Sequence, residues 1–305
     1  MKRFTALALS LLLLLSGCVS HASSPDPAPV QDAVSMTETP TEAPAEPPAE
    51  PETEPETEPE PEEPYVRIID PSKPMVALTF DDGPAEGTSD QILDILEANH
   101  ALATFFEVGV NVAQYPDPLP RMAEMGCEIG SHSNAHKDLS KLKKSALLAD
   151  LDAADQKFLD AGVDAPTLVR PPYGAVNKTV KSATGRAMIT WSIDTLDWQS
   201  KDAQAVIDYI QNYGDLDGQV VLMHSTYSST VEAVEVLVPW LQEQGYQLVT
   251  VTELMAYYYG ELPQPDRLYG YTFFTTRGRT DTPIELPSMF PPAAEDTAGD
   301  AAELP

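Results

Sequence analysis

Basic residues are scarce in this sequence. Its 305 residues include 18 Lys and Arg against 48 Asp and Glu, which gives a formal net charge of −30. No Lys or Arg occurs between Phe4 and Val66, and the rest of the chain is acidic on balance. Nucleic acids and other polyanions bind through clustered cations. This composition therefore argues against nucleic acid as a partner and against a polyanionic substrate.

The apolar run near the N-terminus is too short to cross a membrane. Phe4–Leu15 is almost wholly apolar, whereas a spanning helix needs about 20 such residues. A basic start, residues 1–3, precedes it and Leu-Ser-Gly-Cys follows, so residues 1–18 are predicted to form a secretory signal peptide. The ending at Cys18 resembles a bacterial lipobox, in which the Cys is lipidated and becomes the first mature residue. An ordinary signal peptide with an incidental Cys is the alternative.

Cysteine is also scarce, with two residues in the chain. If Cys18 carries lipid, two or more acyl chains on it would anchor the protein to the outside of the cell membrane. Cys127 is then the remaining thiol, so the exported domain has no internal disulfide. Cys127 lies on an expected short strand, and we interpret it as a buried small residue.

Residues 19–64 contain almost nothing apolar to bury. Pro, Glu, Ala and Thr dominate, with the repeat Pro-Glu-Thr-Glu-Pro-Glu-Thr-Glu-Pro-Glu starting at Pro51. We predict a disordered acidic linker that could reach about 140 Å at ~3.1 Å per residue. It would act as a spacer between the membrane and a folded domain, or only as a solubilising leader. Residues 281–305 are again acidic and rich in Ala and Pro, and we predict a disordered tail.

Residues 65–280 remain, which is enough for one domain with a sizeable core. Short apolar runs alternate with helix-like stretches, and this indicates a parallel sheet with crossovers, either an open doubly wound sheet or a barrel. About seven strands favour a distorted (β/α) barrel. The expected strands are Val76–Phe80, Ala103–Val108, Glu128–Ser131, Thr167–Arg170, Met188–Ile193, Val220–Met223 and Gln247–Val251. The expected helices are Thr88–Asn99, Leu119–Met125, Lys144–Ala161, Asn177–Thr184, Asp202–Asn212 and Thr230–Gln244.

Two adjacent carboxylates end the first expected strand. They lie in Thr-Phe-Asp-Asp-Gly-Pro, where Gly83-Pro84 breaks the strand and turns the chain. Neighbouring residues of an extended segment point in different directions, so Asp81 and Asp82 can have different partners. Taken alone, the pair could be no more than a turn.

Polar side chains recur at the carboxyl ends of other expected strands. Because the carboxyl ends of parallel strands meet on one rim, where α/β folds carry their sites, these side chains should converge with the two acids. They are His132 and His136, Arg170, Asp194 and His224.

The two histidines of the second segment are four residues apart. On one helical turn or in a tight loop, this spacing puts the imidazoles of His132 and His136 on one face. A carboxylate from another strand end would complete a His₂–carboxylate set, which is typical of catalytic zinc or iron. A structural zinc site is disfavoured because it usually has four ligands. His100, at a helix end, is interpreted as a surface residue.

Together these segments resemble the polysaccharide deacetylases, metal-dependent carbohydrate esterases that include peptidoglycan and chitin deacetylases. The motifs occur in order over about Tyr65 to Tyr259: Thr-Phe-Asp-Asp-Gly-Pro, His-Ser-x-x-His, Arg-Pro-Pro-Tyr-Gly, Asp-x-x-Asp-Trp and Leu-x-His. Two positions depart from the family pattern. Ser225 stands where members often carry Asp, and Lys137 stands where they often carry Pro. Because of these two departures, the resemblance does not determine the shape of the substrate groove.

The resemblance implies a metal site and a base. Asp82 would be a metal ligand together with His132 and His136. Asp81 would be the general base, oriented by Arg170. A structural ion pair is the alternative for Arg170.

The resemblance also implies an acid and a binding groove. His224 would be the general acid, tuned by Asp194, and the backbone N–H of Tyr173 would help to hold the oxyanion. Leu222 and Trp198 would line the acetyl pocket and the sugar groove. As alternatives, Trp198 and His224 could be core residues and Asp194 a helix N-cap. Asp197 is interpreted as a loop acid only.

The leading hypothesis is a lipid-anchored, extracytoplasmic, metal-dependent N-deacetylase. Zinc is the first choice of metal, and cobalt, nickel or manganese also suit the ligand set. Export next to the cell's own wall favours N-acetylglucosamine of peptidoglycan as substrate. Alternatives are deacetylation of chitooligosaccharides or of acetylated xylan, or an inactive wall-binding module. No obligate protein partner is implied.

Overall fold

A computed structural model describes residues 68–286. The expected signal peptide with Cys18, the linker of residues 19–64 and residues 287–305 of the expected tail lie outside the described residues. Within the described range, no helix combines the length and hydropathy needed to cross a membrane.

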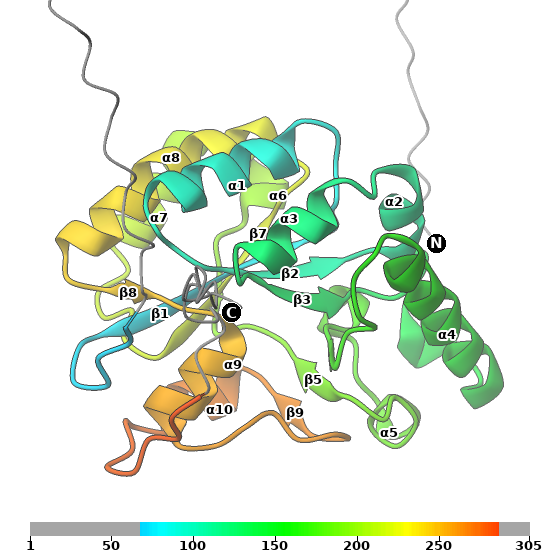
Figure 1. Ribbon diagram of the computed structural model, residues 1–305. Helices are drawn as coiled ribbons and strands as arrows, with labels where there is room; N and C mark the ends of the chain where they lie inside the picture. The colour runs from blue at the N-terminus through cyan, green and yellow to red at the C-terminus, as the bar shows by residue number, and fades with distance from the viewer. Residues whose placement is uncertain (1–67, 287–305) are drawn as a thin grey trace, which may run out of the picture. The chain divides into compact units, whose positions relative to one another are not determined.

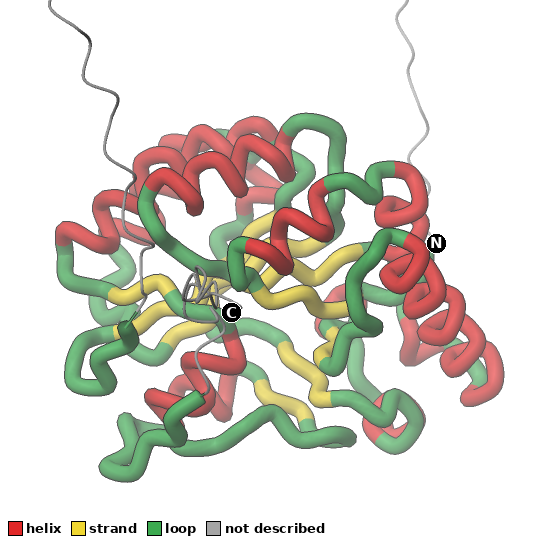
Figure 2. Tube along the Cα trace, viewed as in Figure 1, coloured by secondary structure: helices red, strands yellow, loops and turns green. Residues whose placement is uncertain are grey.

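The described residues form one curled parallel sheet surrounded by helices (Figures 1 and 2). The strand order is β6-β7-β1-β2-β3-β4-β5-β9, and β8 pairs with the start of β1. The fold is the expected distorted (β/α) barrel. The strands are β1 (Met75–Asp81), β2 (Thr104–Glu107), β3 (Glu128–Ser131), β4 (Leu168–Val169), β5 (Ala187–Ile189), β6 (Ile193–Asp194), β7 (Gln219–His224), β8 (Gln247–Leu248) and β9 (Leu268–Tyr269).

The helices pack on both faces of the sheet. Figure 1 shows α1, α7 and α8 on one side of β1 and β7, and α9 and α10 on the other. The helices are α1 (Thr88–Ala98), α2 (Gly109–Gln114), α3 (Pro118–Glu124), α4 (Lys144–Asp160), α5 (Lys178–Lys181), α6 (Asp197–Ser200), α7 (Ala203–Gln211), α8 (Ser228–Glu243), α9 (Val251–Glu253) and α10 (Tyr271–Thr276). Short 3₁₀ turns η1 (Leu139–Lys141) and η2 (Pro172–Gly174) and a π-helical turn η3 (Leu254–Tyr258) complete the set.

The central strand β1 is buried along its whole length. Its side chains alternate between two cores, as a parallel strand covered on both faces requires. Val76 and Phe80 belong to the cluster formed with α1, α7 and α8, whereas Ala77 packs with η3 and α10. This alternation fixes the face to which Asp81 points.

The expected strand Met188–Ile193 is in fact two strands. β5 pairs with β4 and β9, whereas β6 pairs with β7 at the other end of the strand order. Between them, Thr190 donates its N–H to Tyr269 O at 2.8 Å and Ser192 donates to Val220 O at 3.0 Å. The chain therefore crosses between the two ends of the sheet within three residues. The sequence concealed this crossing because the run of residues 188–193 is mostly apolar, with Thr190 and Ser192 as its polar members.

Several smaller expectations can also be compared with the structure. Cys127 is buried at 5% exposure, and His100 is exposed, as predicted. Beyond residue 280 the chain still bonds to the domain, because Ile284 donates its N–H to Ala256 O at 3.0 Å and Leu286 donates to the Tyr257 hydroxyl at 3.2 Å.

Candidate active site and metal centre

The carboxyl ends of β1, β3, β6 and β7 meet around a pocket of about 390 Å³. Strands β1 and β7 pair in parallel, and their register places Asp81 directly opposite His224. Every site residue predicted in the domain lines the pocket except Arg170, which contacts Asp81. The lining residues are Asp81, Asp82, His132, His136, Tyr173, Trp191, Asp194, Trp198, Leu222, His224 and Tyr227.

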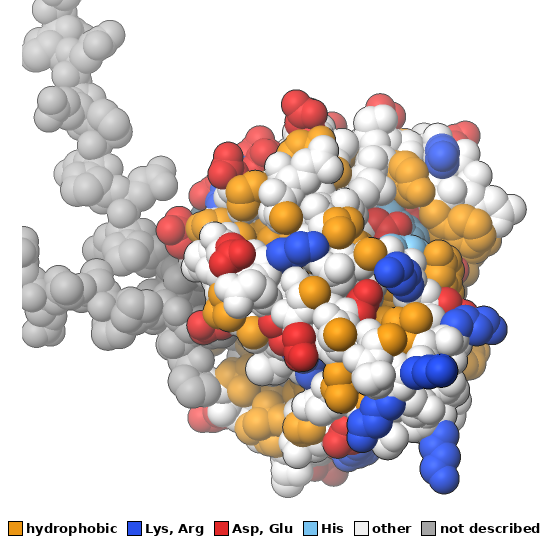
Figure 3. Space-filling view, turned by 90° about the vertical axis from the view of Figure 1, so that its right-hand side faces the viewer, with side chains coloured by type: hydrophobic (Ala, Val, Ile, Leu, Met, Phe, Trp, Pro, Cys, Tyr) orange, Lys and Arg blue, Asp and Glu red, His pale blue; other side chains and the backbone are white. Residues whose placement is uncertain are grey.

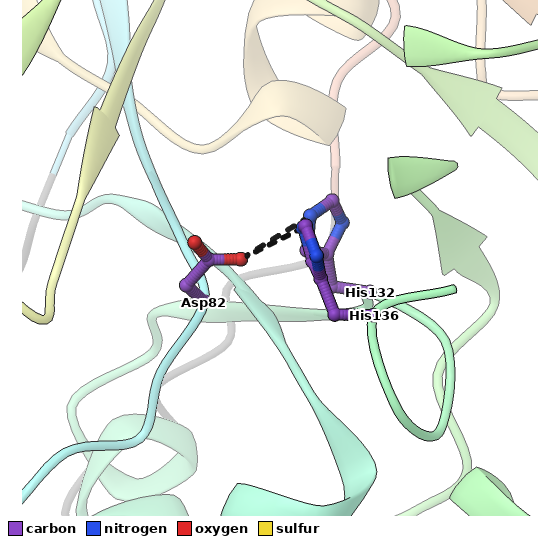
Figure 4. Close-up of side chains that lie close together, drawn as sticks. All are labelled: Asp82, His132 and His136. Atoms are coloured by element: carbon purple, nitrogen blue, oxygen red, sulfur yellow. Dashed lines mark ion pairs between the residues drawn. The ribbon is translucent and has the colours of Figure 1, made fainter. Parts of the chain in front are cut away.

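Asp82, His132 and His136 form a three-ligand cluster (Figure 4). One oxygen, Asp82 Oδ1, lies 3.5 Å from His132 Nε2 and 3.2 Å from His136 Nε2. That oxygen is buried and accepts no hydrogen bond from the described residues. One carboxylate oxygen and two imidazole nitrogens within 4.8 Å of one another match the donors that zinc and similar divalent metals take. The residues present therefore fit a metal ion.

The orientation of His132 is fixed from the far side of its ring. Its Nδ1 lies 2.6 Å from the carbonyl oxygen of Arg170. A carbonyl only accepts, so Nδ1 carries the proton and Nε2 presents a lone pair toward Asp82. Burial lowers the pKa of His132 to about 3, which keeps the ring neutral. A neutral imidazole is the form that binds a metal.

The turn that carries Asp82 is tightly packed. Asp82 has a φ of 70° and His136 a φ of 51°, so both ligands lie in the left-handed region, which non-glycine residues seldom adopt. A Cβ at Gly83 would clash with Ser225 Oγ and Glu107 Oε2. Glycine is required here because side chains from β2 and from the end of β7 close over the turn.

Arg170 holds Asp81 in a buried ion pair. One guanidinium nitrogen of Arg170 donates to Asp81 Oδ1 at 2.6 Å and to Thr79 Oγ1 at 2.8 Å. The guanidinium also lies 4.0 Å from the centre of the Phe106 ring, and Arg170 is fully buried. Burial raises the pKa of Asp81, while the charge of Arg170 opposes the rise. The contact between Arg170 and Asp81 is the one that the family resemblance implies.

The partner of His224 is Asp197, which corrects the expectation that Asp194 would tune this histidine. His224 Nδ1 lies 2.8 Å from Asp197 Oδ1, and the N–H of His224 donates to Asp197 Oδ2 at 2.7 Å. Asp197 is fully buried and also accepts from the Thr230 hydroxyl at 2.8 Å. It is therefore not the simple loop acid expected from the sequence.

Asp194 has a different, local role in the structure. Its Oδ1 accepts the N–H of Leu196 at 2.9 Å, so the carboxylate turns back on its own loop. Leu196 has a φ of 58°, and this turn starts α6 with Asp197 beneath His224. The two acids share one motif, and the turn between them decides which one reaches the histidine.

The pKa of His224 results from opposing influences. Burial is the largest and lowers the pKa, but the hydrogen bond and the charge of Asp197 outweigh it, with further help from Asp81 and Asp82. The net effect raises the pKa of His224. A histidine with a raised pKa holds its proton at neutral pH more readily than a free one.

Aromatic side chains surround the mouth of the pocket. Tyr173 and Trp198 are 68% and 45% exposed, and Tyr173 lies edge-on to the His136 ring at 4.8 Å between centroids. The motifs did not point to Trp191 or Tyr227, because neither lies at a strand end or in a family motif. Exposed aromatic faces of this kind suit the apolar faces of sugars.

Glu107, the last residue of β2, is a further acid near the site. It is fully buried, and neither carboxylate oxygen is hydrogen-bonded to any described residue. Burial raises the pKa of Glu107 well above its usual range, and the charges of Asp81 and Asp82 add to the rise. In the sequence, Glu107 was hidden within an apolar run.

Comparison with known proteins identifies the family. The polysaccharide deacetylase family model matches residues 69–191. A peptidoglycan-N-acetylglucosamine deacetylase from Bacillus cereus is 34% identical over 191 residues, which make up 60% of this chain and 89% of that protein. The chain belongs to the polysaccharide deacetylase family. The family predicted from the sequence motifs is thus confirmed. This family is metal-dependent, which agrees with the cluster of Asp82, His132 and His136.

Two other deacetylases extend the comparison. The peptidoglycan-N-acetylmuramic acid deacetylase PdaC from Bacillus subtilis strain 168 is 37% identical over 191 residues, which are 63% of this chain. The chain spans 41% of the length of that relative. The solved structure of T48 deacetylase with substrate superposes with a TM-score of 0.62 at 37% identity, covering 66% of this chain and all of that one.

Proposed function

We propose that the protein is a metal-dependent hydrolase that removes N-acetyl groups from N-acetylglucosamine units of peptidoglycan. The observation that carries this proposal is the pocket that joins a His₂–Asp cluster to two further groups, Asp81 and His224. Amide hydrolysis needs a nucleophile, stabilisation of the oxyanion and a proton for the leaving nitrogen. One pocket thus contains a candidate for each requirement.

Asp82, His132 and His136 would hold the metal ion. Zinc is the proposed metal, and cobalt, nickel or manganese would suit the same donors. When bound, such an ion lowers the pKa of a water molecule to about 7 and polarises a carbonyl group. The lone pair of His132 Nε2 is kept for this purpose by the hydrogen bond from Nδ1 to Arg170 O.

Asp81 is the proposed general base. Its Oδ1 is held by Arg170, whereas its Oδ2 lies 3.6 Å from His132 Nε2, on the side of the metal ligands. The positive charge of Arg170 favours the ionised carboxylate that a base must be, against the effect of burial. Asp81 would therefore accept the proton of the attacking water.

His224 is the proposed general acid, with Asp197 rather than Asp194 as its partner. Asp197 holds the ring through Nδ1, which leaves Nε2 as the nitrogen that gives a proton to the departing amine. The backbone N–H of Tyr173 would donate to the oxyanion. Leu222 would contact the acetyl methyl group, and Trp198 would contact the sugar.

The choice of peptidoglycan rests on relatives and on location. Two of the relatives compared above, those from Bacillus cereus and Bacillus subtilis, are named for deacetylation of N-acetylglucosamine or N-acetylmuramic acid in peptidoglycan. A signal peptide, a lipid on Cys18 and an acidic spacer would keep this domain outside the membrane and next to the cell's own wall. Neither nucleic acid nor an obligate protein partner is part of the proposal.

The test is release of acetate from purified peptidoglycan and from N-acetylglucosamine oligomers. Release should stop with a chelator and return when zinc is restored. Asp81→Asn should lose turnover while it keeps bound metal, since Asp81 is not one of the three ligands. If no acetylated sugar releases acetate with metal restored, the enzyme function is excluded and a wall-binding module becomes the better reading.

A further inference from the structure

One face of this acidic domain is rich in lysine. Six exposed lysines come from two short segments, residues 137–144 and 178–181. In Figure 3, Lys and Arg side chains gather on the right-hand side of the view, mostly below a small pale blue area of histidine atoms. We call these six residues the lysine face: Lys137, Lys141, Lys143, Lys144, Lys178 and Lys181.

The lysine face adjoins the mouth of the candidate active site. Lys137 directly follows the metal ligand His136, and the Tyr173 hydroxyl lies 3.5 Å from the carbonyl oxygen of His136. From Tyr173 the chain runs to α5, where the Asn177 side chain donates to Ser140 O at 2.8 Å. This bond joins the two lysine-bearing segments into one surface.

The lysine face is hollowed at α5. A depression of about 570 Å³ is lined by Val176, Asn177, Lys178, Lys181, Ser182 and Asp266. Within the described part of the chain, one lysine of this face forms an ion pair: Lys141 Nζ lies 3.8 Å from Asp138 Oδ2. The Lys141 side chain is nevertheless 79% exposed. Asp138 and Asp266 oppose two of the six positive charges, so the lysine face keeps a net positive charge.

We propose that the lysine face binds the carboxylates of peptidoglycan, on its peptide stems and on lactyl groups that carry no stem, while a sugar of the same strand occupies the catalytic pocket. This inference rests on the proposed function and names its substrate class as a carboxylate-bearing glycan. Neutral glycans such as chitin or xylan offer no partner to the lysines. The acidic net charge of the chain argued against a polyanionic substrate. A glycan strand, however, responds mainly to the charges of the surface that it contacts, because salt largely screens charges more than about 10 Å away.

The first experiment compares two substrates that differ in charge alone. Soluble peptidoglycan fragments are tested before and after their carboxylates are converted to amides. The wild-type protein should deacetylate the unmodified fragments with a kcat/KM about fivefold higher, through a lower KM, and 0.5 M salt should remove the difference. Equal values for the two substrates at low salt would overturn the proposal.

The second experiment removes charge from the lysine face. The variant Lys141→Gln/Lys178→Gln/Lys181→Gln should lose most of the preference for the unmodified fragments. A charge-matched control, Lys73→Gln/Arg121→Gln/Arg277→Gln, removes three cations that lie outside the lysine face and its depression and should keep the preference. A preference lost equally in both variants would show a net-charge effect and contradict the proposal.

A binding measurement separates this inference from the proposed function. Metal-loaded Asp81→Asn protein is titrated with both kinds of fragment. Preferential binding to the unmodified fragments supports the lysine face even if the wild-type protein releases no acetate. Tighter binding to a peptide of residues 51–63 than to any fragment would instead assign the face to the chain's own acidic segment, and the proposal would be wrong.

Discussion

Asp82 and Asp197 both lie beside histidines at strand ends, but their surroundings are opposite. Asp82 Oδ1 faces two imidazole nitrogens and accepts no hydrogen bond from the described residues. Asp197 accepts from the His224 ring, the His224 N–H and the Thr230 hydroxyl. A buried carboxylate oxygen without donors, such as Asp82 Oδ1, is costly unless a cation compensates it, whereas a buried carboxylate with several donors is stabilised by them. The first arrangement suits a metal ion, and the second suits a protonated histidine.

Removal of Asp82 should have the largest effect. Asp82→Ala should lose bound metal and at least about 10³-fold in kcat/KM, because a metal ion supplies several kcal/mol of stabilisation to such a transition state. Metal content after dialysis, measured by atomic emission, and acetate release test this expectation. Asp197→Ala is the control and should keep its metal. Full metal content in Asp82→Ala would mean that Asp82 does not hold the metal and that the proposed division of roles between Asp82 and Asp197 is wrong.

Removal of the charge on Asp197 should act on the proton instead. Asp197 raises the pKa of His224. Because His224 must be protonated to act as the general acid, activity should fall as the pH rises through the pKa of His224. Asp197→Asn should therefore move the alkaline limb of the kcat profile to lower pH and reduce kcat about 10²-fold. Asp194→Asn should leave that limb in place. A shift in Asp194→Asn but not in Asp197→Asn would restore the assignment made from the sequence.

The contrast also shows what the sequence could and could not reveal. The metal side was predictable because strand ends, a four-residue spacing and the motifs each point to Asp82, His132 and His136. The acid side was not, since Asp194 and Asp197 belong to one motif and the left-handed turn at Leu196 selects between them. No periodicity in the sequence marks such a turn.

The same limit applies to the fold. The long buried strand β1 is visible as an apolar run, and its neighbours follow from the alternation with helices. In contrast, β6 and β9 have two residues each and carry no pattern of their own. Pairing with β7 and β5 forms them, so they depend on tertiary contacts. The crossing at Trp191, which brings an aromatic ring to the pocket, was missed for this reason.

The packing behind Asp82 can be tested through Gly83. Gly83→Ala would push a methyl group against Ser225 Oγ and Glu107 Oε2, which are both buried. We expect a loss of about 1–3 kcal/mol in the free energy of unfolding and weaker metal binding, because the turn must shift. Chemical denaturation and metal titration measure these effects. Gly278→Ala meets no atom within 4 Å and should be nearly neutral. Unchanged stability in Gly83→Ala would show that the turn is more adaptable than its contacts indicate.

The smallest expected effect concerns Glu107, the buried acid behind the metal ligands. Its pKa is raised in the folded protein, chiefly by burial, while an unfolded Glu titrates near 4.5. Stability from the protonated form is thus fully present below about pH 4.5 and is lost as the pH rises toward the folded-state pKa. Glu107→Gln keeps the shape without the charge, so it should match the wild type at pH 4 and be more stable by about 1 kcal/mol at pH 8.

Urea denaturation at the two pH values, with a chelator present throughout, measures the effect of Glu107→Gln. The exposed acid Glu86 provides the control, since Glu86→Gln should show no such difference between pH 4 and pH 8. A Glu107→Gln protein that is less stable than the wild type at pH 8 would mean that Glu107 is ionised in the folded state. Since neither oxygen of Glu107 accepts a hydrogen bond from a described residue, such an anion would resemble Asp82 rather than Asp197 and would itself need a cation.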